Sequence, residues 1–230
     1  MKVEIYSDIV CPWCYIGERR FARALEAFGS QKDVEVVFRP YQLDPETPTE
    51  ARPLKGYLQS RYGASASAML DRVTETGAGE GITFDWDNAL SVNTATAHRL
   101  MGLAERENGA AVQTRLAEQL FELYFTRGGD VSDHAALTEA AVAAGMDGDR
   151  VRDYLASGEG LPETEAGFDQ ARQLGIRAVP TFVFDGKYAV QGAQSVSTFL
   201  RALEEVEASA RPADEGENEG AACEDGVCEV

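Results

Sequence analysis

Two cysteines separated by two residues lie near the start of the chain, in the motif Cys11-Pro12-Trp13-Cys14. The motif follows an apolar stretch and opens a helical pattern that extends to Phe28, and a Cys-x-x-Cys pair at such a strand-to-helix junction is typical of dithiol redox chemistry. Unpaired N–H groups and the positive end of the helix dipole favour a thiolate on Cys11. Pro12 suits the first helical position because its missing N–H needs no partner there. Cys14, one turn later, is then placed to attack a mixed disulfide formed at Cys11.

Zinc binding is the main alternative for these cysteines. The chain has four cysteines, enough to coordinate one zinc ion, but the second pair, Cys223 and Cys228, lies near the other end in an acidic stretch. Structural zinc sites usually take both ligand pairs from ordered turns, and the sequence around Cys223 and Cys228 does not predict an ordered turn. Redox chemistry is therefore favoured, and no metal site is expected.

The elements around the motif alternate between strand and helix at both ends of the chain. Residues 2–6 and 33–39 are expected to be strands, and Asp185-Gly186 between two β-rich runs predicts a hairpin. Residues 54–158 show helical periodicity almost throughout, apart from an extended connector. The helices are predicted at roughly 11–28, 64–76, 93–107, 110–126, 132–144, 147–157, 163–174 and 195–208, with Asn93, Ser132, Asp147 and Ser195 as N-caps.

Pro180 is the second informative position. It stands in Val179-Pro180-Thr181, just before an apolar run, where a proline fits only at a strand start or with an unusual peptide bond. Cys-Pro-Trp-Cys after a first strand, a helical insertion, and Gly-Ile-x-x-Val-Pro-Thr-Phe before a hairpin together resemble the DsbA family of the thioredoxin superfamily. More narrowly, the chain resembles the cytoplasmic FrnE-like branch, over roughly residues 1–208.

This resemblance implies an α/β (α+β) protein with a thioredoxin fold and a large all-helical insertion. The thioredoxin-like domain would be discontinuous, formed by residues 1–48 and 160–208, with the insertion at 49–159. Residues 209–230 are Glu-, Gly- and Ala-rich and are expected to be a disordered acidic tail. In the family, the proline that matches Pro180 is cis and lies against the Cys-x-x-Cys motif, and the backbone of Val179 would then bind an extended substrate segment.

The tail contains the remaining cysteines, Cys223 and Cys228, as a pair separated by four residues. Members of the FrnE-like branch carry a similar pair, which implies a secondary redox pair that passes electrons to the Cys11–Cys14 disulfide. Two incidental tail thiols are the alternative. The neighbouring Glu224 disfavours thiolate formation at Cys223, so the pair would attack poorly but be stable once joined.

Three further polar residues invite interpretation. His98 borders an apolar helix face, and packing of its ring and a role in lining the site are equally compatible with that position. His134 is expected to be exposed to solvent. Asp8, three residues before Cys11, is a candidate proton acceptor for Cys14, although a solvated loop carboxylate is the favoured expectation.

Charge and composition exclude some classes of function. The 230-residue chain has 39 acidic against 21 basic residues and a net charge of −18, which argues against binding to nucleic acid or to an anionic membrane surface. No apolar signal segment precedes the first strand, and no stretch has the length of a transmembrane helix. We therefore expect a cytoplasmic protein, where cysteines serve catalysis or redox sensing more often than structure.

These observations predict a thiol–disulfide oxidoreductase, with disulfide isomerase activity as an extension of the same chemistry. Its partners would be proteins or small molecules that carry thiols or disulfides. It would need no cofactor beyond its own redox-active disulfide, with glutathione as a candidate co-substrate, and would act as a monomer or homodimer. Glutathione-dependent isomerases and transferases of the hydroxychromene-carboxylate isomerase and kappa types share the fold and are the alternative, although they typically have serine where Cys11 stands. A non-catalytic binding module or holdase over Pro180 is a third class.

Overall fold

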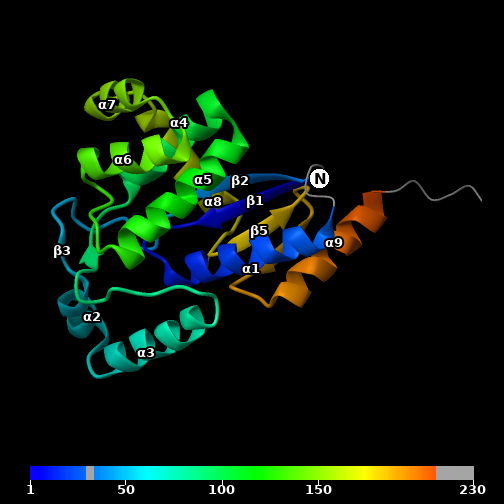
Figure 1. Cartoon of the computed structure of the whole chain (residues 1–230), viewed down its shortest axis with the longest axis horizontal. Coiled ribbons are helices and arrows are strands. Elements are labelled where there is room, and N and C mark those ends of the chain that lie inside the picture. The colour runs from blue at the N-terminus through cyan, green and yellow to red at the C-terminus, as the bar shows by residue number, and fades with distance from the viewer. Residues whose placement is uncertain (30–33, 211–230) are drawn as a thin grey trace, which may run out of the picture.

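A four-stranded sheet lies at one end of the molecule and a group of helices at the other (Figure 1). The structure is a computed structural model that describes residues 1–29 and 34–210. The strand order is β2-β1-β5-β6, with β1 parallel to β2 and antiparallel to β5, and β5 antiparallel to β6. The strands are β1 (Lys2–Ser7), β2 (Glu35–Pro40), β5 (Thr181–Phe184) and β6 (Tyr188–Gln191).

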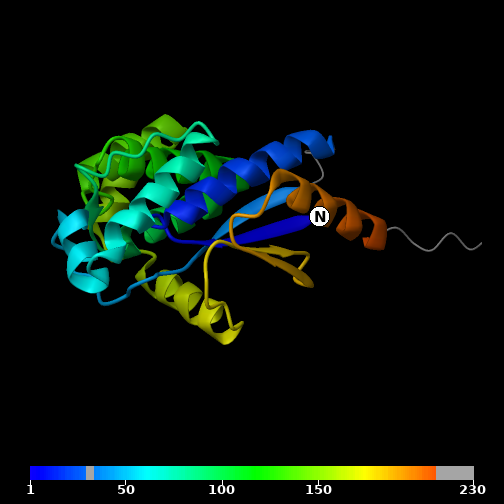
Figure 2. The same ribbon diagram turned by 90° about the horizontal axis from the view of Figure 1, so that it is seen from below.

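Helices cover both faces of this sheet, as Figure 2 shows: α1 (Pro12–Phe28) and α9 (Val196–Ala210) lie on one face and α8 (Leu161–Gln173) on the other. We call the sheet with these three helices the sheet part. The chain between β2 and α8 forms the helical insertion, which also contains a two-stranded ladder of β3 (Arg52–Pro53) and β4 (Leu90–Ser91). Its helices are α2 (Leu54–Tyr62), α3 (Ser65–Ala78), α4 (Ala95–Asn108), α5 (Ala110–Phe121), a π-helical turn η2 (Glu122–Thr126), α6 (His134–Ala144) and α7 (Gly148–Ala156).

Local sequence signals explain the elements that carry the cysteine motif. Cys11 is the N-cap of α1, Pro12 is in the first turn, and Gly29 ends the helix with a left-handed φ of 76°. At the hairpin between β5 and β6, Asp185 and Gly186 have φ values of 48° and 67°, as a two-residue turn with both central residues at positive φ requires.

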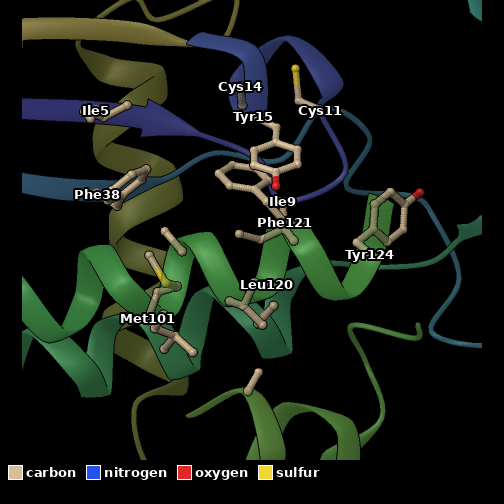
Figure 3. Packing of buried hydrophobic residues seen from close by; sticks show 14 of the residues in the cluster. Ile5, Ile9, Cys11, Cys14, Tyr15, Phe38, Met101, Leu120, Phe121 and Tyr124 are labelled. Atoms are coloured by element: carbon tan, nitrogen blue, oxygen red, sulfur yellow. The ribbon is translucent and has the colours of Figure 1, made fainter. Parts of the chain in front are cut away.

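The sheet part and the helical insertion share one buried core. In the sheet part, Phe182 of β5 packs against Phe199 of α9, with ring centroids 4.5 Å apart. At the junction, Tyr15 of α1 stacks on Phe121 of α5, with centroids 5.1 Å apart and planes inclined by 11°. Figure 3 shows this stack directly beside the cysteine motif. The packing of the insertion therefore reaches the segment that holds the sulfur atoms.

The insertion also covers one edge of the sheet. Gln113 of α5 is 1% exposed, and its side chain accepts a hydrogen bond from Phe38 N at 2.8 Å and donates to Phe38 O at 3.0 Å. It also donates to Met101 O at 3.2 Å. These bonds satisfy backbone groups at the outer side of β2 that would otherwise be buried without partners.

Two predicted helix caps are wrong by one residue. The N-cap of α4 is Thr94, which makes no side-chain cap bond, while Asn93 one residue earlier accepts from Ala95 N and donates to Thr47 O. The N-cap of α6 is Asp133, whose carboxylate accepts from Ala136 N, while Ser132 bonds to Asp130. The other two caps are confirmed: Asp147 accepts from Arg150 N, and the Ser195 hydroxyl accepts from Thr198 N.

Candidate active site

Cys11 and Cys14 are both free thiols at the start of α1, and they are 4% and 2% exposed. Their surroundings differ. Cys11 lines a cleft of about 560 Å3, whereas Cys14 is not part of its wall. In Figure 3 the side chain of Cys11 points away from the ring of Tyr15 and the packed cluster below it. An incoming sulfur atom in the cleft would therefore meet Cys11.

The segment before β5 closes the site from the other side. The Val179–Pro180 peptide bond is cis. The thiol of Cys11 donates to Val179 O at a sulfur–oxygen distance of 3.7 Å. A Cβ at Gly17 of α1 would come within 2.9 Å of Pro180 Cγ, so only glycine lets the proline ring pack this closely against α1. Sequence reasoning did not single out Gly17, because its role depends on a residue far along the chain.

The Cys14 thiol lies under the motif in a mostly apolar setting. Burial raises its pKa well above the usual value, and the neighbouring Cys11 adds to the rise. The hydroxyl of Ser7 and the backbone of Asp8 act in the opposite direction. Cys14 therefore rests as a neutral thiol.

Asp8 is not the solvated loop carboxylate that was favoured from the sequence. It is 1% exposed, because the loop after β2 and the start of α4 close over it. Its Oδ2 accepts from Leu43 N at 2.8 Å, and its Oδ1 lies 3.3 Å from Nε2 of His98. One carboxylate oxygen therefore faces the loop after β2, and the other faces α4.

His98 was a candidate for lining the site, and the structure corrects its position. The side chain lies behind Asp8 and is 6% exposed, with its ring against the edge of Phe168 at 5.5 Å. It lines a second cavity of about 400 Å3 instead of the cleft. Packing explains this position: α4 turns this face toward α8. His134 is exposed, as predicted.

The walls of the cleft come from segments far apart in the sequence. Trp13 and Val179 belong to the sheet part, whereas α2 and α3 of the insertion form the opposite wall. Three large apolar side chains on its rim are strongly exposed: Leu43, Tyr62 and Met69, at 49%, 44% and 45%. Three arginines also line it: Arg61, Arg72 and Arg177. No sequence motif marks these residues, since only packing brings them together.

Cys223 and Cys228 lie outside the described residues. Within residues 1–29 and 34–210, no three side chains of His, Cys, Asp or Glu stand close enough together to hold a metal ion. In the same part of the chain, none of the helices combines the length and the apolar character needed to cross a membrane.

Residues 2–204 match the DSBA-like thioredoxin domain. The chain belongs to this family. A probable DsbA oxidoreductase from Streptomyces coelicolor is 36% identical and superimposes with a TM-score of 0.84, over 93% of this chain and 92% of that one. The uncharacterised protein YwbO from Bacillus subtilis is 27% identical over 215 residues, 88% of this chain and 96% of the relative. The cytosolic disulfide reductase DsbM from Pseudomonas aeruginosa is 17% identical, with a TM-score of 0.63 over 91% of this chain and 100% of that one.

Family membership confirms the predicted fold class, a thioredoxin fold with a helical insertion, and the predicted class of enzyme, a thiol–disulfide oxidoreductase. A hydroxychromene-carboxylate isomerase structure also superimposes on this DsbA-like protein, with a TM-score of 0.63 at 14% identity. That likeness extends to the fold alone. It does not favour the isomerase alternative.

Proposed function

We propose that this DsbA-like oxidoreductase uses Cys11 as the nucleophile and Cys14 as the resolving thiol. The observation that carries the proposal is that Cys11 lines the cleft while Cys14 lies beneath it. The Cys11 thiolate attacks one sulfur of a substrate disulfide and releases the other as a thiolate, which takes a proton. Cys14 then loses its proton and attacks Cys11 Sγ, which releases the second substrate thiol and leaves the Cys11–Cys14 disulfide. The reverse sequence oxidises a substrate dithiol.

The different surroundings of the two sulfurs fit these roles. Cys11 is at the N-terminus of α1, where the positive end of the helix dipole stabilises an anionic sulfur. Burial keeps Cys14 protonated until the mixed disulfide has formed, because its pKa is raised. This order prevents both sulfurs from competing for the incoming disulfide.

Val179 contributes a backbone contact to the substrate. In the reduced state its carbonyl accepts from the Cys11 thiol. Once Cys11 loses its proton, that donor is gone, and the carbonyl becomes free to accept from an amide of the substrate. The backbone beside Pro180 would then hold an extended substrate segment next to the sulfur.

The test is the reduction of insulin disulfides by dithiothreitol, with the wild type beside Cys11→Ser. The wild type should accelerate the reaction, and the variant should return it to the uncatalysed rate. A circular dichroism spectrum and melting temperature matched to the wild type would establish that the variant is folded. Equal acceleration by a folded Cys11→Ser would overturn the assignment and turn attention to chaperone-like binding by the cleft.

Glutathione is the proposed low-molecular-weight co-substrate. In support, a structure of DsbM from Pseudomonas aeruginosa with GSH superimposes on this chain with a TM-score of 0.59 at 16% identity. The cleft volume of about 560 Å3 also lies within the usual range for small-molecule sites. Reaction of the oxidised protein with glutathione should give a mixed disulfide on Cys11, detected by mass spectrometry, and none in Cys11→Ser.

The tail pair is proposed to pass electrons to the motif. In this step the Cys223–Cys228 dithiol would be oxidised to a disulfide while the Cys11–Cys14 disulfide is reduced to two thiols. The support is the spacing of the pair in the sequence. A Cys223→Ser/Cys228→Ser variant should lose the internal transfer in a single-turnover experiment yet keep direct reaction with dithiothreitol. Redox behaviour of this variant that is unchanged from the wild type would exclude the role.

We further propose that the protein belongs to the FrnE-like branch and acts in the cytoplasm, as a monomer or homodimer. The spaced cysteine pair of the tail and the sequence of the motif support the branch. Fractionation of cells that express the protein from its own gene, and light scattering of the purified chain, would test location and assembly.

A further inference from the structure

The cleft differs in charge from the rest of this acidic molecule. The chain carries a net charge of −18, but three arginines and only two aspartates line the cleft. Both aspartates are already engaged. Asp44 pairs with Arg61 at 3.0 Å, and Asp8 is buried and bonded to the backbone. The charged side chains that line the cleft therefore sum to one net positive charge, and neither Arg72 nor Arg177 is paired with a carboxylate of the described residues.

Arg72 approaches the motif from the insertion. It lies on α3, is exposed, and its guanidinium carbon is 5.6 Å from the centroid of the Trp13 ring. This cation–π contact holds the guanidinium over Trp13, one of the two residues between the cysteines, but leaves its N–H groups free. Within the described part of the chain, Arg72 forms no ion pair.

Arg177 approaches from the opposite side. It is exposed, lines the same cleft, and stands two residues before Val179, whose carbonyl contacts the Cys11 thiol. It also forms no ion pair with any described residue. Some arginines elsewhere pair with carboxylates, as Arg20 does with Glu80, whereas Arg52, Arg127 and Arg201 are exposed and, within the described residues, form no ion pair. Two guanidinium groups that form no ion pair within the described residues therefore line the same cleft as Cys11.

Guanidinium groups bind carboxylates through paired N–H donors, and more strongly in a partly desolvated cleft than in open solvent. We propose that Arg72 and Arg177 make the site selective for small disulfides that carry carboxylates near their sulfur atoms. This inference rests on the proposed function of Cys11 and names its preferred substrate class. The bond changes remain those of thiol–disulfide exchange: the anionic disulfide is reduced to two carboxylate-bearing thiols while Cys11 and Cys14 become a disulfide.

The experiment measures how fast the pre-reduced protein reacts with three disulfides of similar size. Dithiodipropionate is anionic, hydroxyethyl disulfide is neutral and cystamine is cationic. Each second-order rate constant is divided by that of free dithiothreitol with the same disulfide, which removes differences in intrinsic reactivity. The normalised rate should be about tenfold higher for the anion than for the neutral compound, lowest for the cation, and more equal at high salt.

Variants connect the preference to the two residues. Arg72→Gln and Arg177→Gln should each reduce the ratio of the anionic to the neutral rate about threefold, and the double variant should abolish this preference. Arg72→Lys keeps the charge and should keep most of the preference. Arg201→Gln removes the same charge from α9, outside the cleft, and should change nothing.

The outcomes separate this inference from the proposed function. Equal normalised rates for all three disulfides in the wild type would overturn the anion selectivity while leaving dithiol chemistry intact. If the double variant still prefers the anionic disulfide, groups other than Arg72 and Arg177 cause the preference, and the proposal is also overturned. If Cys11→Ser reacts as fast as the wild type with every disulfide, the proposed function itself fails.

Discussion

The sheet part and the helical insertion contribute different things to the site. The sheet part holds both sulfur atoms, the helix N-terminus that favours a thiolate, and the cis bond before Pro180. The insertion holds no cysteine and instead supplies the opposite wall of the cleft, with Arg72 and the exposed Met69. In the proposed function the exchange reaction takes place at the sheet part, and the insertion adds Arg72 to a cleft in which Arg177 stands outside the insertion.

The two parts are nevertheless packed as one structure. Tyr15 stacks on Phe121 beside the motif, and Gln113 bonds to the outer strand of the sheet. Asp8, just before the motif, lies beside His98 of α4. Because these contacts join the insertion to the segments on which the motif stands, a change in the insertion can alter stability and selectivity without removing the reactive group.

The largest expected effect comes from Cys14→Ala, which breaks the chemistry within the sheet part. Catalytic turnover of a disulfide substrate should fall to the uncatalysed rate, because the mixed disulfide on Cys11 has no resolving thiol. The first attack should persist, so mass spectrometry should find one substrate thiol bound per protein. The wild type, treated identically, should show no such adduct. Full turnover by the variant would contradict the assigned order of the two sulfurs.

Phe121→Ala tests whether the insertion and the sheet part unfold together. Removing a fully buried ring that stacks on Tyr15 should lower the free energy of unfolding by about 3–5 kcal/mol. Urea denaturation followed by circular dichroism and by tryptophan fluorescence should give one coincident transition for both probes. Leu174→Ala, at a side chain that is 59% exposed, should change stability by less than about 0.5 kcal/mol. Two separate transitions would mean that the parts are independent.

Gln113→Leu removes the hydrogen bonds by which α5 covers β2. Leucine keeps much of the volume but leaves the N–H and C=O of Phe38 unsatisfied, which should cost about 2–4 kcal/mol. Gln119→Leu is the matched change on the same helix, at a side chain without a hydrogen bond in the described structure, and should cost far less. Hydrogen exchange should show faster opening of β2 in Gln113→Leu only. Equal exchange in both variants would argue against this role.

The smallest effect concerns pH. Burial raises the pKa of Glu18 to about 7, with Arg19 opposing the shift and Glu118 of α5 adding to it. The folded carboxyl therefore stays protonated while the unfolded one ionises, so stability falls as pH rises from about 4.5 to about 7. Glu18→Gln should remove this loss and stabilise the protein by about 1–3 kcal/mol near pH 8, measured by urea denaturation.

The control for this prediction lies on the same helix. Glu26 is exposed, so Glu26→Gln should leave the difference in stability between about pH 5 and pH 8 unchanged. If the stability of Glu18→Gln depends on pH as that of the wild type does, the carboxyl of Glu18 is not the group that lowers stability as pH rises.

Local signals account for what the sequence predicted. Cys11 and Pro12 fit a helix start, and Asp185-Gly186 fits a tight turn, because each depends on the conformations of a few adjacent residues. The caps at Asn93 and Ser132 were misplaced by one residue: Asp133 caps α6 in place of Ser132, and α4 begins one residue later than predicted, with Thr94 as an N-cap that makes no side-chain bond. The helix predicted to run to residue 126 changes to π-helical geometry at Glu122, which no residue pattern indicated.

The amino-acid sequence by itself was enough to predict the Cys11–Cys14 motif at a helix start and the family to which the chain belongs. The tertiary structure alone decided that Asp8 is buried, that His98 lines a second cavity, and that Arg72 and Arg177 line the same cleft as Cys11. The physical reason is the distance along the chain over which each kind of interaction acts. A motif specifies the backbone over a few residues, whereas burial and charge at a site depend on which distant segments the shared core packs together.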